Sequence, residues 1–431
     1  MRIIRSQKDL ALFLKRLKKR ASGISAEIEN TVREILADVR RKGDIAVKKY
    51  TKRFDKHDLP IKLTDSDILR HSKEADKKIV KALEISAKRI WSFHERQKET
   101  SWSFKEKDTL LGQLIKPIER VGVYVPGGKA SYPSTVLMNV IPAQVAGVKE
   151  IALCVPTPYG EINPYVMAAI NLLGVKEIYR IGGAQAIGAM AYGTETIKRV
   201  DKIVGPGNIF VAIAKKMVFG EVDIDMIAGP SEILIIADKT SNGAFVAADM
   251  LSQAEHDEMA SSILLTDSDE LIKDVLEELN KQLNSLKRRD IAKKSLSRYG
   301  AIIKTKNIKE AIDIANEIAP EHLEIMTREP QRDLEYVKNA GAVFLGQWTP
   351  EPLGDYSAGP NHTLPTGGTA RFSSPLGTYD FMKRMSILKF DKKGLRDLAE
   401  IVESIADIEG LEAHANTIRI RLSNKKLSPN T

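Results

Sequence analysis

The sequence is poor in cysteine, in aromatic residues and in long apolar runs, and each shortage excludes a class of protein. Its single cysteine rules out an intrachain disulfide. Cys154 lies in the apolar run 151–155, which predicts a small buried hydrophobe and not a nucleophile. No apolar run is long enough to span a bilayer. Residues 2–16 are too charged for a secretory signal and predict an amphipathic helix. The expected location is therefore the cytoplasm, with no membrane partner.

The charge is mixed along the chain and not segregated. There are 66 Lys and Arg against 57 Asp and Glu, a net charge of +9, which could attract nucleic acid. Basic residues are interleaved with acids, as in residues 73–78, and only 6% of the residues are aromatic. Basic runs without aromatic stacking positions are weak signals for nucleic acid. We predict a solvated surface of mixed charge, no nucleic-acid partner, and a mild positive field that attracts an anionic cofactor.

The residue pattern changes near Val121. Before this point the chain has helical spacing and little Gly or Pro. After it, short β runs alternate with helical patterns, which predicts parallel sheets with helices on both faces. At 431 residues, the length favours about three domains. The predicted strands form two series, 121–125, 151–155, 177–181 and 202–204, then 233–237, 263–266, 300–303, 323–326 and 342–345.

Two later segments have their own character. Residues 346–376 are crowded with Gly, Pro, Ser and Thr and read as one long loop, which is usually functional or disordered. Three aromatic residues within it argue against disorder. Residues 392–421 predict two helices, or a helix and a strand, broken at Glu409-Gly410.

Histidine is scarce, with seven in the chain, and four of them lie in short segments rich in Gly, Pro and acids. Histidine is the commonest metal ligand and changes protonation readily near neutral pH. A scarce residue that recurs beside carboxylates and turn formers suggests one site built from distant stretches of chain, in an enzyme that uses a metal. The four are His256, His322, His362 and His414. The other three, His57, His71 and His94, lie among Lys and Glu and predict solvated helix faces.

Each candidate metal ligand can also be interpreted without a metal ion. Gln253 and His256 are three apart, so both side chains can reach one point from a single helix face. That spacing is common, however, and Gln is an unusual zinc ligand. Asp355 is either a ligand or a turn residue. Taken alone, His414 is a surface histidine on a helix.

Pro320-Glu321-His322 opens a predicted strand. Adjacent residues of a regular strand point to opposite faces, so both side chains reach one pocket only if the backbone is irregular. Pro320 favours that irregularity. An adjacent carboxylate and imidazole can divide the work of proton transfer. The competing interpretation is a helix-to-strand turn with two solvated polar residues.

Glycine-rich turns end three of the predicted strands. They are Val125-Pro126-Gly127-Gly128, the segment 181–188, and Gly205-Pro206-Gly207-Asn208. Glycines between a strand and a helix N-terminus can admit a pyrophosphate. The spacing differs from the standard dinucleotide fingerprint, but three such turns support one another. Tyr124, Gln185 and Asn208 lie beside them and could contact a dinucleotide.

Taken together, these motifs resemble the histidinol dehydrogenase family, from about Arg120 to the C-terminus. Their number and order make coincidence implausible. The segments that carry the resemblance are Val123–Gly128, Gly205–Asn208, Ala228-Gly229-Pro230-Ser231-Glu232, Ser252-Gln253-Ala254-Glu255-His256, Pro320–Glu324 and Gly359-Pro360-Asn361-His362.

The resemblance implies two Rossmann-like α/β domains in tandem, with a helical N-terminal segment and a small C-terminal extension, in an intertwined homodimer. Residues 1–20 would form a helix associated with the C-terminal extension. Residues 21–122 and 232–375 would form the first α/β domain, and 123–231 the second, NAD-binding one. Residues 376–431 would form the dimerisation extension.

The resemblance also implies a reaction, the four-electron oxidation of L-histidinol to L-histidine through L-histidinaldehyde, with two NAD and one zinc ion per subunit. This is the last step of histidine biosynthesis. Glu321 and His322 match the family's acid–base pair. Matches to the zinc ligands are Gln253, His256, Asp355 and His414. Matches to the NAD contacts are Tyr124, Gln185 and Asn208. Matches to the substrate contacts are Ser231, His362 and Glu409, together with His322 and the four zinc ligands. His414 and Glu409 would act across the dimer interface.

Two other functions remain open at this stage. One is a zinc hydrolase acting on an amide or ester, in which Glu321 activates water and no nicotinamide is used. The other is a basic interaction module that binds nucleic acid or an acidic partner. Formation of NADH from histidinol and NAD distinguishes the family's reaction from both.

Overall fold

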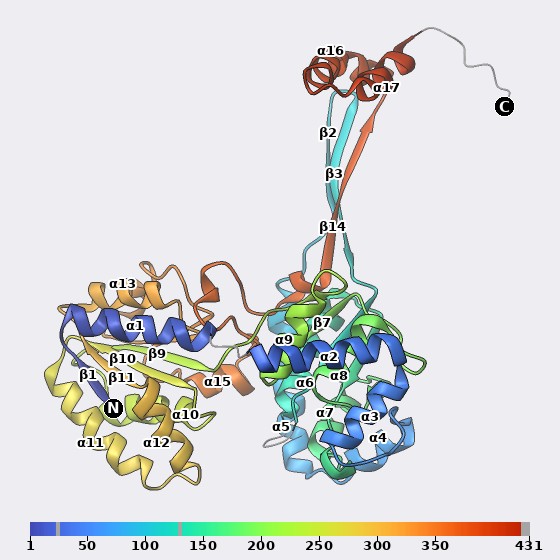
Figure 1. Ribbon diagram of the computed structural model, residues 1–431. Coiled ribbons are helices and arrows are strands. Elements are labelled where there is room, and N and C mark those ends of the chain that lie inside the picture. Colours follow the sequence, from blue (N-terminus) through green and yellow to red (C-terminus); the bar gives the residue numbers. More distant parts are fainter. Residues whose placement is uncertain (23–25, 128–131, 424–431) are drawn as a thin grey trace. The chain divides into compact units, whose positions relative to one another are not determined.

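The computed structural model describes residues 1–22, 26–127 and 132–423 and separates into two compact units (Figure 1). Unit 1 comprises Met1–Lys98 and Ile118–Phe381, and unit 2 comprises Glu99–Pro117 and Met382–Thr431. Gly128 of the first predicted glycine turn lies outside the described residues. In the described ranges, no helix is long and apolar enough to cross a membrane.

The first sheet of unit 1 has six parallel strands in the order β1-β11-β10-β9-β12-β13. Five of them confirm the second predicted series, whereas β1 was not predicted. Every residue of β9 is buried, as expected for a central strand covered on both faces. The strands are β1 Arg2–Ile4, β9 Glu232–Ala237, β10 Ser261–Thr266, β11 Ala301–Lys304, β12 His322–Met326 and β13 Ala342–Leu345.

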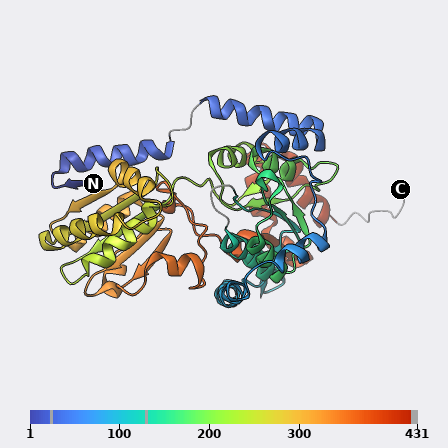
Figure 2. The same ribbon diagram turned by 90° about the horizontal axis from the view of Figure 1, so that it is seen from below.

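Helices cover both faces of this sheet (Figure 2). Alternate residues of β9 point to opposite sides, so Ile233 and Ile235 pack with α10, α11 and α12, and Leu234 and Ile236 pack with α1 and α13. Residues 1–22 thus belong to this sheet within unit 1, and their association with the C-terminal extension stays a prediction. The helices are α1 Gln7–Ser22, α10 Gly243–Ala254, α11 Asp269–Leu283, α12 Arg289–Tyr299, α13 Ile308–Ile318, α14 Pro330–Leu334 and α15 Glu351–Tyr356.

The second sheet of unit 1 has five parallel strands in the order β6-β5-β4-β7-β8. It confirms the first predicted series, although β6 ends two residues earlier than expected and β8 was not predicted. The chain runs from β4 to β5 and β6, then returns to β7 on the other side of β4. The strands are β4 Arg120–Tyr124, β5 Glu150–Cys154, β6 Glu177–Tyr179, β7 Lys202–Val204 and β8 Asp223–Ile224.

Apolar faces of α2, α3, α8 and α9 form one core with this sheet. Helix α6 is apolar all round and buried along nearly its whole length, as expected for a helix enclosed by other elements; it contacts β4, α5 and α7. The helices are α2 Ala26–Lys42, α3 Asp44–Phe54, α4 Asp65–Ser72, α5 Lys77–Glu95, α6 Pro133–Ala146, α7 Pro164–Leu172, α8 Gly183–Tyr192 and α9 Ile209–Val218.

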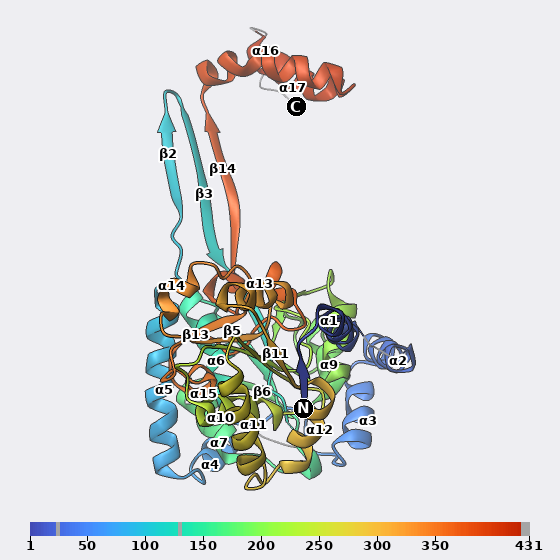
Figure 3. The same cartoon turned by 90° about the vertical axis from the view of Figure 1, so that its left-hand side faces the viewer.

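Unit 2 is an antiparallel sheet, β14-β3-β2, followed by two helices (Figure 3). Of the two alternatives predicted for residues 392–421, the structure has two helices and not a helix and a strand, and the break falls at Gly410, whose φ is +69°. The three strands were not predicted. Their bounds are β2 Trp102–Glu106, β3 Thr109–Pro117 and β14 Met382–Phe390, and the helices are α16 Lys392–Ile408 and α17 Glu412–Leu422.

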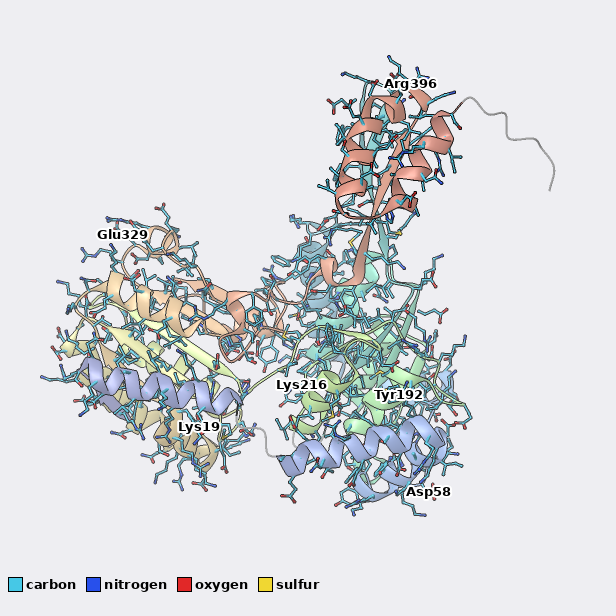
Figure 4. All side chains as sticks on the ribbon, turned by 45° about the horizontal axis from the view of Figure 1, so that its top comes forward. Lys19, Asp58, Tyr192, Lys216, Glu329 and Arg396 are labelled. Atoms are coloured by element: carbon cyan, nitrogen blue, oxygen red, sulfur yellow. The ribbon has the colours of Figure 1, made fainter. Side chains whose placement is uncertain are left out.

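Charged side chains such as Lys19, Asp58 and Glu329 are exposed (Figure 4). This distribution agrees with the predicted surface of mixed charge.

Candidate active site

A cavity of about 780 Å³ in unit 1 collects seven of the residues singled out in the sequence. They come from segments that open β9 and β12, from the end of α10 and from the segment after β13. The seven are Ser231, Gln253, His256, Glu321, His322, Asp355 and His362. Pro126, Pro206 and Gly207, from the turns that end β4 and β7, line the same cavity.

Glu321 and His322 both serve the cavity because the backbone is irregular where the sequence predicts it. Helix α13 is followed by Ala319 in a left-handed conformation, with φ +52°, and Glu321 precedes the first strand residue, His322. Since β12 pairs with β9 in parallel, with His322 opposite Ile233, the two residues lie beside Glu232 and Ile233 at the amino edge of the six-stranded sheet.

Glu232 organises this pair through its backbone. Its N–H donates to Glu321 Oε2 at 2.8 Å, and its carbonyl accepts from His322 Nδ1 at 2.9 Å. A carbonyl can only accept, so Nδ1 carries the proton and the neutral ring has its lone pair on Nε2. The Glu232 carboxylate forms a buried ion pair with Arg20 of α1. Glu232, which was assigned no role from the sequence, therefore fixes the tautomer of His322 and the position of Glu321.

Two carboxylates face the free nitrogen of His322. Its Nε2 lies 3.8 Å from Glu351 Oε1 and 3.9 Å from Asp355 Oδ1. Within the described part of the chain, these three side chains form the group that could hold a metal ion, with one ligand atom from each lying within 4.8 Å of the others. His362 Nδ1 lies 4.0 Å from the same Asp355 oxygen. Sequence reasoning missed Glu351, which lies between two prolines and carries no local signal of burial.

Gln253 is fully buried on α10, and neither its Oε1 nor its Nε2 has a hydrogen-bond partner in the structure. Leaving a buried amide unsatisfied costs about 1–3 kcal/mol, so the position calls for a ligand. His256 lies just past the end of the helix, and its N–H donates to the Gln253 carbonyl at 3.2 Å. Gln253 therefore fits either a metal ion or a bound substrate.

Burial shifts the proton affinities of this region strongly. Desolvation raises the pKa of Glu321 well above its usual value and lowers the pKa of His322 and of His362. Desolvation, reinforced by Asp355, raises the pKa of Glu351 to about 10. Such a concentration of buried carboxyl groups favours a cation among them.

Behind Glu351 lie two more buried carboxyl groups. The Glu351 N–H donates to Glu324 Oε1 at 2.8 Å, and burial raises the pKa of Glu324 and brings that of Asp249 to about 6. These acids extend the acidic region away from the cavity wall into the interior of the α/β core.

The three predicted NAD contacts lie at the carboxyl edge of the five-stranded sheet. Tyr124 ends β4, and its hydroxyl accepts from the Gly183 N–H at 3.1 Å. Gln185 is buried on α8, and its Oε1 has no hydrogen-bond partner in the structure. Asn208 caps α9, accepting from two backbone N–H groups. None of the three is among the residues that line the cavity.

Two expectations about the histidines were wrong. His94 is completely buried on α5 and His57 is nearly so in the segment after α3, because the His94 side of α5 packs against Asn361 and the His57 ring meets Thr157. His94 Nδ1 lies 2.7 Å from Gln97 Oε1 and its Nε2 lies 3.4 Å from Asn361 Nδ2. It therefore supports the segment that carries His362. His71 is half-buried beside Glu74.

The segment 346–376 is not one continuous loop, because it contains α15, on which Asp355 lies. The burial of Cys154 in β5, which raises the pKa of its thiol, confirms that it is a small core residue.

Glu409 and His414 lie in unit 2, at the end of α16 and the start of α17, and both are exposed. The cavity of unit 1 is lined without them.

Comparisons with known proteins agree with the sequence motifs. The family model described as histidinol dehydrogenase matches residues 18–422. Histidinol dehydrogenase of Aquifex aeolicus is 54% identical over 411 residues, 95% of this chain and 96% of that protein. That of Geobacter sulfurreducens is 54% identical over 402 residues, 92% of this chain and 94% of the relative. A crystal structure of histidinol dehydrogenase from Elizabethkingia anophelis has a TM-score of 0.92 at 39% identity and covers 98% of both chains.

Proposed function

The chain belongs to the histidinol dehydrogenase family, and from that premise we propose that it oxidises L-histidinol to L-histidine through L-histidinaldehyde with two NAD, the last step of histidine biosynthesis. The observation that carries the proposal is 54% identity to a histidinol dehydrogenase over 95% of the chain. The decisive experiment is to add histidinol and NAD and to measure NADH and histidine. Hydrolysis of an amide or ester without NADH formation would contradict the proposal.

Glu321 and His322 form the acid–base pair. His322 Nε2 faces the cavity with its lone pair, because Nδ1 donates to Glu232. It can therefore accept the hydroxyl proton of histidinol as hydride leaves the adjacent carbon. Glu321, held by the Glu232 N–H, activates water against the aldehyde in the second oxidation. Ser231 and His362, which line the same cavity, contact the substrate.

Zinc is supported by the donor set. Gln253, His256 and Asp355 supply one buried amide oxygen without a partner, one imidazole and one carboxylate in a single cavity. His414 of a second copy of the chain completes a four-ligand site, one zinc ion per subunit. When bound, zinc supplies Lewis-acid polarisation and a template for the substrate. The competing ligand group is His322, Glu351 and Asp355.

Metal content separates the two ligand groups. If the proposed set is right, His256→Ala loses zinc whereas Glu351→Gln keeps it. The reverse result supports the group around His322. Asp355→Asn belongs to both groups and serves as the positive control, since it loses zinc in either case.

NAD is supported by the topology of the five-stranded sheet. In such sheets ligands bind outside the carboxyl ends of the strands, where the strand order reverses. That point lies between β4 and β7, which end at Tyr124 and at the turn before Asn208. Gln185 follows β6 at the same edge. NAD supplies the hydride acceptor.

A homodimer with shared sites is supported by unit 2. Its helices expose a series of large apolar side chains that a partner could cover. They are Leu398, Ile401, Val402, Ile405, Ile408, Leu411 and Ile420. In this arrangement Glu409 and His414 serve the site of the second copy, and residues 376–431 form the dimerisation extension. The single buried cysteine supports a reducing, cytoplasmic location.

Complementation tests the shared site. A His414→Asn chain and a His256→Asn chain are each inactive, but a mixed dimer contains one intact site and recovers partial activity. Verified heterodimers without recovery would exclude the sharing of His414 while leaving the reaction itself untouched.

A further inference from the structure

A buried ion pair lies beside the turn that ends β7. Lys215 of α9 and Asp225, which follows β8, have side chains only 2% and 1% exposed. Removing two charges from water costs more than their attraction returns unless further hydrogen bonds compensate. The additional contacts of this pair therefore indicate what the pair does.

Both groups of the pair hold the backbone of Gly205. Asp225 Oδ2 accepts from the Gly205 N–H at 2.8 Å, and Lys215 Nζ donates to the Gly205 carbonyl at 2.9 Å. Asp225 Oδ1 also accepts from the Met226 N–H at 2.6 Å. The two peptide groups that flank Gly205 are thus fixed from both sides.

The conformation of Gly205 determines how the end of β7 meets the end of β4. Its φ is +110°, and a Cβ there would lie 2.1 Å from the Tyr124 carbonyl oxygen. The next residues are Pro206 and Gly207, which line the cavity, and Asn208, which caps α9. Lys215 and Asp225 line the cavity as well.

We propose that Lys215 and Asp225 are positioning residues for NAD, which hold the turn 205–208 in the orientation that receives the dinucleotide between β4 and β7. This inference rests on the proposed function. The pair is neutral overall, so it acts through the backbone and adds no net charge to attract phosphate. It reaches two predicted NAD contacts: Tyr124 through Gly205, and Asn208 along the chain.

The test is a double variant that removes both charges at once, Lys215→Met with Asp225→Asn. Asparagine keeps one acceptor for the backbone N–H groups, whereas methionine loses the donor to Gly205. We expect the NADH dissociation constant, measured by fluorescence titration, and the KM for NAD to rise about tenfold, as for the loss of one hydrogen bond to a charged group. The KM for histidinol and the zinc content stay near wild type. Lys215→Arg, which keeps a charged donor, recovers part of the loss.

A control uses the partly buried pair Arg120 and Glu177 at the amino edge of the same sheet, where Arg120 also pairs with Glu150. Their side chains are 8% and 24% exposed. The variant Arg120→Met with Glu177→Gln removes this ion pair and the Arg120 contact with Glu150, and we expect it to lower the unfolding midpoint by at least as much. Its NADH dissociation constant remains within about twofold of wild type, because it is remote from Gly205.

The possible outcomes distinguish the positioning role of Lys215 and Asp225 from the proposed function. If wild type binds NADH and the Lys215–Asp225 variant binds it equally well, the positioning role is wrong and the proposed function stands. If the control weakens NADH binding as much, the pair acts only through fold stability, which also overturns the inference. If wild type neither binds NADH nor reduces NAD with histidinol, the proposed function fails, and the inference with it.

Discussion

The two parallel sheets of unit 1 contribute opposite edges to one cavity. The five-stranded sheet contributes its carboxyl edge, through Pro126, Pro206 and Gly207, and the six-stranded sheet contributes its amino edge, through Glu321 and His322. One edge is built from glycine turns and backbone groups. The other is built from buried carboxylates and imidazoles.

The polarity of the helices explains this difference. At the carboxyl edge of the five-stranded sheet, α8 and α9 begin, and their N-termini carry partial positive charge. At the amino edge of the six-stranded sheet, α10 and α13 end near Gln253 and Glu321, with partial negative charge. One edge therefore suits the phosphates of a dinucleotide, and the other suits a cation. Because strand–helix units have opposite polarity at their two ends, one such fold can provide an anion site at one end and a cation site at the other.

Metal removal gives the largest expected effect, and it tests most directly whether the metal and NAD bind at different sheet edges. Treatment with a chelator should abolish NADH formation, because the proposed ligands Gln253, His256 and Asp355 would lose their cation. The NADH dissociation constant should stay within about twofold of wild type, since the proposed NAD site lies at the other edge. Activity should return when zinc is added. Equal loss of cofactor binding would break the division between the edges.

Glu321→Gln should divide the two oxidations. The variant keeps the shape of the side chain but cannot activate water, so the aldehyde step slows by about 10²–10⁴-fold. The alcohol step, which we assign to His322, should slow much less. Single-turnover measurements starting from histidinol and from histidinaldehyde test this, and equal slowing of both steps would refute separate roles for the pair.

Gly205→Ala should disrupt the turn after β7, at the carboxyl edge of the five-stranded sheet. An alanine there combines a φ of +110° with a Cβ 2.1 Å from the Tyr124 carbonyl oxygen, and we expect a loss of about 3 kcal/mol in the free energy of unfolding together with weaker NADH binding. Gly220→Ala is the matched control. Its φ of +100° is similar, but nothing lies within 4 Å of the new Cβ, so it should cost about 1 kcal/mol. Similar losses measured by urea unfolding would mean that the contact with β4 is unimportant.

His94→Gln should have the smallest effect and is visible as a pH dependence. Burial lowers the pKa of His94 from its usual 6.5, so the unfolded chain binds a proton before the folded one does. Wild type should lose stability as the pH falls below 6.5, by up to about 1.4 kcal/mol per pH unit until the folded pKa is reached. The variant lacks this part of the loss. Urea unfolding on both sides of this pH tests it, and identical pH slopes would exclude His94.

The strands around the site could be predicted because a buried parallel strand is a local signal. Glu232–Ala237 is a run of apolar residues after its first acid, and the turns after β4 and β7 are marked by Gly and Pro. Strands β2 and β3 were missed for the opposite reason. All of β2 is exposed and most of β3 is half-buried, so neither carries the continuous buried apolar run by which the parallel strands could be recognised.

Burial of polar residues could not be predicted, because it depends on what packs against them. Glu351 becomes part of the site only when α15 brings it to His322 Nε2. His94 has the same kind of neighbours in sequence as an exposed histidine, yet its side of α5 meets Asn361. The sequence around Glu351 and around His94 contains no local signal for either contact.

By itself, the sequence determined which segments are candidates for the chemistry, since residue type and turn composition are local properties. Gln253, His256, Glu321 and His322 could all be named from their motifs, as could the glycine turns. Only the tertiary structure decided how they are arranged. It set the tautomer of His322 through the Glu232 carbonyl, brought Glu351 beside His322, and placed Lys215 and Asp225 on Gly205. These contacts join residues from different helices, strands and turns, between 10 and 90 positions apart, and their energies arise only when folding removes water from between them.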